Sequence, residues 1–446
     1  MSTITHVLKR SGAVVSFTPE RITNAIYRAS VAVGERNLQR SRQISDLVVA
    51  DLEKHYGVNK IPTIEDIQDT VEKVLIENGD VKVAKAYILY RDDRAKKRQE
   101  RAELASRPSV NIPWAKIWHV LDWAIDQDLN TTAGLARRIA KGEIAEIITA
   151  SEQKYEEDIE NVTEMVALNK DSLKIVIITG PSSSGKTTST IKLGQRLEHL
   201  GLKLTTLNVD NYFFNLDMHP KDEFGDYDFE TPQALDLELI NQHLSKLVAG
   251  EEIYVPYYDF KTGMRSSDLT PMHLAENEII LIDSLHGLYP PMTDSVGDEH
   301  KFKLYLEPLL QLKTSYGEYI RWTDIRLLRR MLRDASHRSY DPTKTLMHWH
   351  YVRTSEMRNI IPFVSHADYI VNSAMPYELC YYKPKLMNEF QKWTTELEGD
   401  PLKTDAYIRA KRNRAALEDI PALIDESLIP SDSVIREFIG GSSLKY

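Results

Sequence analysis

The residues from Gly180 to Thr187 combine two glycines, a lysine and a hydroxyl side chain at the spacing G-x-x-x-x-G-K-T. An apolar run over 173–179 precedes them and a helical pattern follows, which is the context that this phosphate-binding motif requires. Glycines let backbone N–H groups surround an anion, and the N-terminus of the next helix adds its positive dipole end. Lys186 would reach the outer phosphates, and the Thr187 hydroxyl would hold Mg²⁺. The stretch therefore predicts a nucleoside triphosphate site. The residues expected to contact the nucleotide are Gly180, Pro181, Ser182, Ser183, Ser184, Gly185, Lys186, Thr187 and Thr188.

The elements that position this loop follow an alternating pattern. A helix is expected over 188–200, a strand over 202–209, a strand over 278–282 and a short strand over 302–306. Alternating strands and helices predict a parallel α/β sheet flanked by helices. The carboxyl ends of such strands meet at one edge of the sheet, where ligands bind. Gly180, Asp210 and Asp283, which each follow a strand, are therefore expected to converge.

The two aspartates at this edge have the chemistry that phosphoryl transfer needs. Asp283 follows an apolar strand and fits a second Mg²⁺-holding carboxylate beside Thr187. Asp210 is the expected base for an attacking hydroxyl, because its strand is expected to lie beside the phosphate-loop strand. Both aspartates could also be ordinary turn residues at strand ends.

A helix expected over 323–338 supplies cations. Its arginines are spaced i, i+3, i+4 and i+7, which places them on one face of the helix. These residues are Arg326, Arg329, Arg330 and Arg333. Like charges in one stripe repel unless an anion lies opposite, and polyphosphate is the expected anion. A solvated stripe, or one paired with carboxylates, is the alternative.

Composition limits the class of protein. The chain has 446 residues, enough for two or three domains, with 42% hydrophobic and 27% charged residues, as in soluble globular proteins. No apolar run reaches the length of a membrane span, and the first ten residues lack the apolar core of a signal peptide. The single cysteine, Cys380, excludes a disulfide framework, so a cytoplasmic location is expected. The net charge of −10 argues against a protein that coats nucleic acid. Neither a nucleic acid nor a membrane partner is expected.

The first 95 residues read as a small, mostly helical domain. A hairpin over 6–17 turns at Ser11-Gly12, and helical patterns follow from Pro19 onward. The motif V-x-K-R-x-G at 7–12, with VAKAYILYR at 83–91, resembles the ATP-cone, a regulatory nucleotide-binding module. The resemblance implies that Lys9 and Arg10 contact the phosphates of a regulatory ATP or dATP, assisted by Lys85 and Arg91. A solvated basic hairpin is the alternative.

The connector and the tail carry little chemical signal. Helices are expected between the two domains, with Trp114, Ile117, Leu121 and Ile125 as an apolar core stripe. His348 and His350 alternate as in a strand, and we do not expect them to bind metal. Residues 376–446 are expected to be a packing extension with one amphipathic helix over 406–417 and a loose end.

Several motifs follow the phosphate loop in order. They are N-V-D-N-Y-F-F at 208–214, D-F-E at 228–230, Y-D-F at 258–260 and D-x-R-x-x-R-R-x-x-R-D at 324–334. This order, over about residues 173–375, resembles the uridine kinase and phosphoribulokinase family. The resemblance implies transfer of the γ-phosphate of ATP to a primary hydroxyl of a small molecule, with Mg²⁺.

The resemblance also implies roles for single residues. Asp210 falls on the catalytic aspartate of the family, and Glu230 falls where an aspartate usually contacts the sugar hydroxyls. Tyr258 and Phe260 fall on aromatic residues that contact the base. The arginines of the family's lid helix match Arg330, Arg333 and Arg338. The expected catalytic residues are thus Lys186, Asp210, Arg330 and Arg333.

The sequence departs from the family at the acceptor side. Uridine kinases usually carry a histidine after Y-D-F, where this chain has Lys261-Thr262-Gly263. Phe213 stands in place of a tyrosine, Tyr340 in place of a later lid arginine, and Asp283-Ser284 in place of glutamate-glycine. ATP-dependent phosphorylation is compatible with these changes, but uridine as the acceptor is not certain from them. Lys261 could meet an anionic group on the acceptor.

Three functions therefore stand side by side. The first is a kinase of a uridine- or cytidine-like nucleoside, regulated by nucleotide at the ATP-cone. The second is a kinase of another polyhydroxylated or sugar-phosphate acceptor, and the third is a nucleotide sensor without transfer. The expected organisation is an ATP-cone domain over 1–95, a helical connector over 96–170, a P-loop kinase domain over 171–375 and a helical extension over 376–446. The oligomeric state stays open, a homo-oligomer included.

Overall fold

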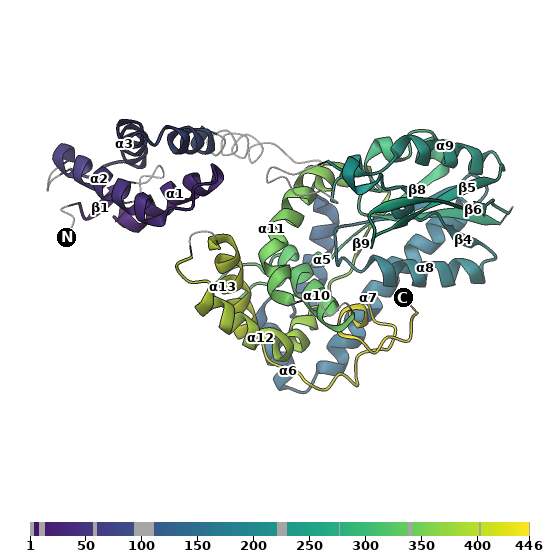
Figure 1. Ribbon diagram of the computed structural model, residues 1–446. Coiled ribbons are helices and arrows are strands. Elements are labelled where there is room, and N and C mark those ends of the chain that lie inside the picture. The colour runs from purple at the N-terminus through teal and green to yellow at the C-terminus, as the bar shows by residue number, and fades with distance from the viewer. Residues whose placement is uncertain are drawn as a thin grey trace. The chain divides into compact units, whose positions relative to one another are not determined.

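The computed structural model describes residues 4–8, 14–56, 60–92, 111–220, 230–275, 277–337, 341–400 and 403–445. Its chain divides into two compact units (Figure 1). The first comprises Met1–Ser109 with Gly399–Thr404, and the second comprises Val110–Glu398 with Asp405–Tyr446. Each unit is described by itself below.

The first unit is a short hairpin with a helical core. β1 (His6–Leu8) pairs antiparallel with β2 (Val14–Ser16), and α1 (Pro19–Ala32), α2 (Leu38–Tyr56) and α3 (Ile64–Glu77) follow. Residues 81–92 are also helical. Pro19 occupies the first turn of α1, as its fixed φ favours. The apolar faces meet in a core that includes Ile26, Val48 and Leu75, so the predicted helical organisation is confirmed.

A five-stranded parallel sheet organises the second unit. Its strands are β3 (Ile175–Thr179), β4 (Lys203–Thr206), β7 (Glu278–Ser284), β8 (Lys301–Glu307) and β9 (Tyr369–Asn372). They lie in the order β4-β7-β3-β8-β9, and every neighbouring pair is parallel. The parallel α/β fold that the alternation predicted is therefore confirmed.

The central strand has a core on each of its faces, because alternate side chains of a strand point to opposite sides. Val176 and Ile178 belong to the core that contains α7 (Ile144–Leu168), α8 (Lys186–His199) and α10 (Trp322–His337). Ile175 and Ile177 belong to the core that contains α9 (Leu237–Val248). Figure 1 shows α8 and α9 on the two sides of the sheet.

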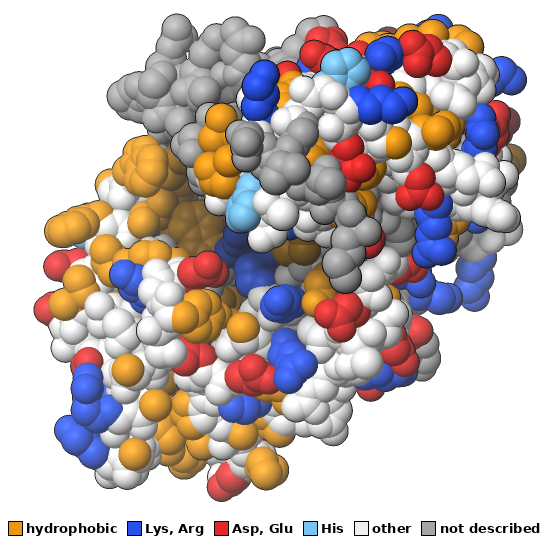
Figure 2. Space-filling model, turned by 90° about the vertical axis from the view of Figure 1, so that its left-hand side faces the viewer, with side chains coloured by type: hydrophobic (Ala, Val, Ile, Leu, Met, Phe, Trp, Pro, Cys, Tyr) orange, Lys and Arg blue, Asp and Glu red, His pale blue; other side chains and the backbone are white. Residues whose placement is uncertain are grey.

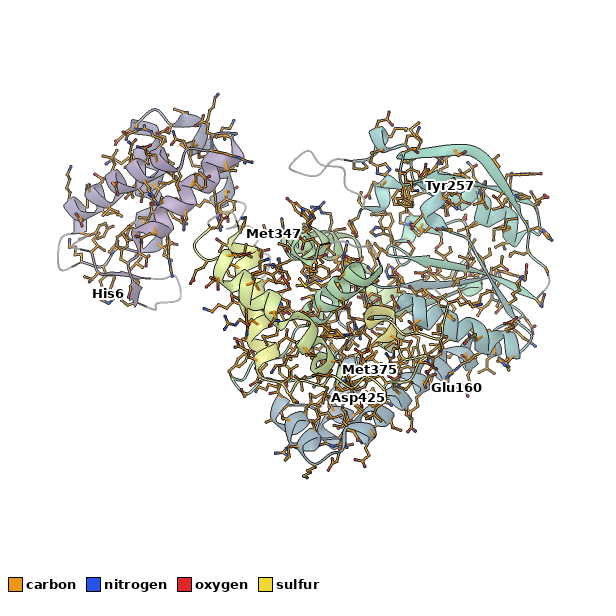
Figure 3. All side chains as sticks on the ribbon, turned by 60° about the horizontal axis from the view of Figure 1, so that its bottom comes forward. His6, Glu160, Tyr257, Met347, Met375 and Asp425 are labelled. Atoms are coloured by element: carbon orange, nitrogen blue, oxygen red, sulfur yellow. The ribbon has the colours of Figure 1, made fainter. Side chains whose placement is uncertain are left out.

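An antiparallel hairpin lies beyond the parallel sheet. β5 (Ile253–Asp259) pairs with β6 (Met264–Met272), with an irregularity between Val255 and Tyr257. Tyr257 is exposed on this hairpin, as Figure 3 shows, whereas Tyr258 is buried. The hairpin therefore presents one face to the core and one to solvent.

The remaining helices of this unit share the core that contains α7, α8 and α10. They are α5 (Trp114–Asp126), α6 (Thr132–Ala140), α11 (Pro342–Asn359), α12 (Glu378–Glu396), α13 (Thr404–Glu418) and α14 (Arg436–Ile439). His348 and His350 lie on α11, so the strand that their alternation indicated is wrong. Trp114 and Ile125 are exposed, so the stripe on α5 is not the core that we expected.

Two observations concern the surface. None of the described helices is both long and apolar enough to cross a membrane. On the face that Figure 2 shows, described Lys and Arg side chains are interspersed with Asp and Glu side chains.

Candidate active site

The phosphate loop joins β3 to α8, and two of its glycines have no substitute. Gly180 has φ +153°, and a Cβ there would lie 2.4 Å from the carbonyl oxygen of Leu306. Gly185 has φ +90°, in the left-handed region that favours glycine. The backbone therefore turns tightly and directs the first N–H groups of α8 into the loop, which fits a phosphate group.

Lys186 lies inside this loop. Its ammonium donates hydrogen bonds to the carbonyl oxygens of Gly180, at 2.9 Å, and Pro181, at 3.4 Å. Burial lowers the pKa of Lys186, while the negative charges of Asp283 and Glu437 oppose that shift. The Thr187 hydroxyl belongs to an exposed residue, so it is accessible to a metal ion.

Asp283 and Asp210 both lie within electrostatic range of Lys186. β7 places Asp283 beside Ile178 of β3. Asp210 lies in a 3-10 helix, Val209–Tyr212, that follows β4. Burial raises the pKa of both carboxyls above its ordinary value, and the positive charge of Lys186 offsets only part of that rise. The structure thus brings these three residues together.

The route by which Asp210 reaches the site differs from our expectation. We expected its strand to lie beside the phosphate-loop strand, but β7 lies between β4 and β3. Parallel strands keep their carboxyl ends at one edge whatever their order, so the convergence survives this correction.

The arginines of α10 divide into two pairs. Arg326 and Arg329 are fully buried: Arg326 is paired with Glu307 and Glu356, and Arg329 with Glu378. The carboxylate-paired alternative therefore holds for these two. Arg330 and Arg333 are partly exposed and lie 3.4 and 3.8 Å from the carboxylate of Asp334, so they too have an acidic neighbour. Arg330 also lies 3.4 Å from the Ser182 hydroxyl of the loop, which makes it a candidate for a phosphate contact.

The residues that we expected to contact the acceptor include Tyr258 and Phe260, which belong to an aromatic cluster. The ring of Tyr258 lies 5.4 Å from that of Phe213 and 5.0 Å from that of Phe260, centroid to centroid. His219 stacks on Tyr258 at 6.2 Å. Phe260 keeps 61% of its surface exposed, so it is the ring that a ligand can contact. The cluster contains a histidine after all, which comes from a segment that the motif comparison did not consider.

The other predicted residues are placed as follows. Lys261 is exposed in the turn after β5, and its N–H donates to Asp259 at 2.9 Å. The backbone carbonyl of Glu230 accepts hydrogen bonds from the side chains of Ser355 and Asn359 on α11. Lys9, Arg10 and Arg338 lie outside the described residues. In the first unit, Arg91 is paired with Asp69 and Glu72.

His286, two residues after β7, is a buried titratable group near the loop. Its side chain keeps 5% of its surface exposed. Burial, with a smaller contribution from the charge of Lys186, lowers the pKa of the imidazole to about 4. The ring is therefore neutral at pH 7.

Glu437 is the residue at the loop that sequence reasoning missed. Its carboxylate accepts hydrogen bonds from the N–H of Thr188, at 3.3 Å, and from the Thr188 hydroxyl, at 3.0 Å. Glu437 lies in α14, near the end of the chain, where we expected a loose end. No local pattern identifies it, because its partner is 249 positions away.

The described residues contain no group of three or more His, Cys, Asp or Glu that could hold a metal ion. Mg²⁺ does not need such a group, because it is usually bound by one or two carboxylates together with water and substrate phosphates. The accessible Thr187 hydroxyl and the Asp283 carboxylate fit that requirement.

A parallel sheet with a glycine loop and a lysine at its edge defines a P-loop protein, and the comparisons agree. Residues 175–379 match the Phosphoribulokinase / Uridine kinase family, and residues 5–96 match the ATP cone domain. Two stretches of the chain are thus similar to these two families, the ATP cone first and the kinase family after it.

Three relatives illustrate these matches. Uridine kinase of Oceanobacillus iheyensis is 26% identical over 46% of this chain and 88% of its own length. Uridine-cytidine kinase B of Dictyostelium discoideum is 26% identical over 44% of this chain and 73% of its own length. A vitamin B12-dependent ribonucleoside-diphosphate reductase of Thermoplasma acidophilum is 38% identical over 24% of this chain, but over only 14% of its own length.

Proposed function

We propose that this protein is an ATP-dependent kinase that phosphorylates a hydroxyl group of a small molecule, with a uridine- or cytidine-like nucleoside as the acceptor. The observation that carries the proposal is that Lys186 lies in the glycine loop, with Asp283 on the strand next to β3 and Asp210 directly after β4, at the same edge of the parallel sheet. The match to uridine kinases over nearly half of the chain supports it. The cytoplasm is the proposed location.

The proposed reaction gives each residue a separate role. The backbone N–H groups of residues 182–188 hold the phosphates of ATP. Thr187 and Asp283 would hold Mg²⁺, which supplies positive charge to the phosphates. Asp210 accepts the proton of the acceptor hydroxyl. The acceptor oxygen then bonds to the γ-phosphorus, while the bond from that phosphorus to the bridging oxygen breaks and ADP leaves. Lys186, Arg330 and Arg333 stabilise the negative charge of the transferred group.

The acceptor is proposed to lie against Phe260, with Tyr258 behind it and Glu230 near its hydroxyl groups. Arg338 and Lys261 complete the proposed acceptor site. A purified full-length protein with Mg·ATP, given nucleosides, sugars and sugar phosphates in turn, tests this proposal. ADP formation that depends on a nucleoside is expected. Equal ADP formation with and without every acceptor would contradict it.

A second acceptor class is favoured by Lys261, an exposed cation next to Phe260. A sugar phosphate would place its anion there. Lys261→Gln would then raise the KM of the phosphorylated acceptor about tenfold or more, but would leave the KM of a neutral nucleoside unchanged.

Regulation is a further part of the proposal. Residues 1–95 are proposed to bind ATP or dATP through Lys9 and Arg10 and to alter the activity of the kinase domain over 171–375. Residues 96–170 would connect the two and 376–446 would extend the kinase. A protein that binds nucleotide but transfers no phosphate is the remaining alternative, favoured by the absence of a histidine directly after Y-D-F and by Asp283-Ser284 in place of glutamate-glycine.

A further inference from the structure

The last helical turn of the chain packs against the phosphate loop. We call residues 431–439 the C-terminal segment. Its Val434, Ile435 and Phe438 are fully buried. Asp432 forms an ion pair with Lys192 of α8 at 2.7 Å, and Ser433 donates a hydrogen bond to Glu152 of α7. In Figure 1 the C-terminal end of the chain lies beside α7 and α8.

The segment contacts the backbone of the loop directly. A Cβ at Gly185 would lie 2.6 Å from Cγ2 of Val434. The guanidinium carbon of Arg329 lies over the ring of Phe438, 4.9 Å from the centroid of that ring. The C-terminal segment therefore covers the side of the phosphate loop at which the backbone of Gly185 would otherwise contact solvent.

Glu437 takes hydrogen-bond donors that a nucleotide needs. The N–H and hydroxyl of Thr188 both donate to its carboxylate. In phosphate loops of this type the backbone N–H groups surround the α- and β-phosphates of the nucleotide. A carboxylate at these donors occupies part of that site and repels the negative charge of a phosphate.

We propose that the C-terminal segment is an intramolecular inhibitor, in which Glu437 occupies the phosphate position at Thr188 and must leave before ATP binds fully. This inference rests on the proposed nucleotide site of residues 180–188. In this proposal the carboxylate of Glu437 competes with the phosphates of ATP. The affinity for ATP therefore depends on how strongly the C-terminal segment binds to the rest of the protein. Asp432 and Ser433 attach the segment to α8 and α7 through contacts that do not involve the phosphate loop.

The competing account is that Glu437 only stabilises the first turn of α8, as acidic groups do at helix N-termini. Under that account Glu437 does not compete with nucleotide, and removing its charge would weaken the first turn of α8. The two accounts predict opposite effects of removing the charge.

The test compares charge-removing variants of the full chain. Glu437→Gln keeps the length of the side chain but replaces the charged acceptor with a neutral one. Asp425→Asn is the matched control, because Asp425 belongs to the same C-terminal stretch (Figure 3) but caps the N–H of Ser427, at 2.9 Å. The dissociation constant of Mg·ATP is measured for each by calorimetry.

The proposal predicts that Glu437→Gln tightens Mg·ATP binding about tenfold or more, since a charge-assisted contact no longer competes. Asp425→Asn is expected to bind like the unaltered protein. Unchanged or weaker binding by Glu437→Gln overturns the inhibitor and leaves the nucleotide site standing. Binding of ATP by none of the proteins overturns both the inhibitor and the proposed function.

A second measurement needs no variant. Amide hydrogen exchange of residues 431–439 is followed in the unaltered protein with and without Mg·ATP. Faster exchange with ATP is expected, because the segment is displaced. Unchanged or slower exchange with ATP bound overturns the proposal.

Discussion

The guanidinium of Arg329 and the carboxylate of Glu378 form a two-point ion pair in the interior of the second unit. Nε of Arg329 donates to Oε2 at 2.7 Å, and Nη2 donates to Oε1 at 3.0 Å. Both side chains are 0% exposed. Arg330, the next residue, is 25% exposed and faces the phosphate loop. Neighbouring arginines on one helix thus have different tasks.

Substitution of each arginine by glutamine should separate these tasks. Arg329→Gln leaves the buried charge of Glu378 unpaired, which costs about 3–5 kcal/mol. Arg330→Gln removes a partly exposed charge that lies 3.4 Å from the buried carboxylate of Asp334. This contact is longer and more exposed than the two-point pair of Arg329, so Arg330→Gln should cost less than Arg329→Gln. Thermal unfolding of the two variants measures the difference. Equal losses of stability would show that the pair around Arg329 is not structural.

The same two variants should differ in catalysis. Arg330→Gln is expected to lower kcat by about 10²-fold, because a cation aimed at the transferred phosphate is lost. If Arg330→Gln were unfolded at the assay temperature, its kcat would say nothing about this role, so the unfolding curve is recorded first. A well-folded Arg330→Gln with unaltered kcat would contradict the role.

The parts of this site that could be predicted from the sequence are those whose residues lie close together in the chain or at strand ends. The phosphate loop was recognisable because Gly180, Lys186 and Thr187 are neighbours in sequence, and the carboxylates of Asp210 and Asp283 followed from strand ends. The partners of the arginine stripe come from β8, α11 and α12, so only the folded chain shows which arginines they neutralise. The order of strands and the contact of Glu437 with Thr188 depend on tertiary packing in the same way.

A buried histidine should make stability depend on pH. The pKa of His286 is about 4 in the fold and 6.5 as an ordinary imidazole. Between these values the unfolded chain binds more protons than the folded one, so stability falls as pH falls from 6.5 to about 4. The shift corresponds to about 3 kcal/mol at most.

The variant His286→Gln cannot titrate, so it should lose less stability than the unaltered protein over this range. Denaturant unfolding at pH 7 and pH 4.5 gives both values. At pH 7 the comparison serves as the control, since the imidazole is neutral in both states there. Parallel losses on acidification in the two proteins would contradict the buried neutral ring.

The exposed ring of Phe260 gives a test of the acceptor position. Phe260→Ala should raise the KM of the acceptor by about threefold to tenfold, because an aromatic contact is worth about 0.5–1.5 kcal/mol. Tyr257→Ala is the matched control: Tyr257 lies on the same hairpin and is 53% exposed, but it belongs to β5 outside the aromatic cluster. Steady-state kinetics with varied acceptor should show an effect of Phe260→Ala alone. An equal effect of both variants would place the acceptor elsewhere.

The regulatory role of the first unit is tested by a double variant. Lys9→Ala with Arg10→Ala removes two cations that are proposed to contact regulatory nucleotide. The response of the activity to ATP or dATP should change, while kcat without the regulatory nucleotide stays the same. Activity is titrated with dATP at fixed substrate. A parallel loss of kcat would indicate a structural role for the two residues.

The most direct test of the proposed kinase compares the unaltered protein with Asp210→Asn. The carboxylate of Asp210 is proposed to accept the proton of the acceptor hydroxyl, whereas an amide cannot do so, and general-base catalysis contributes about 10²–10⁴-fold. Phosphorylated acceptor is measured by mass spectrometry, and Mg·ATP binding is measured on both proteins as the control. Loss of product of about 10² or more with ATP binding retained is the predicted result. Equal product from both proteins would contradict the account.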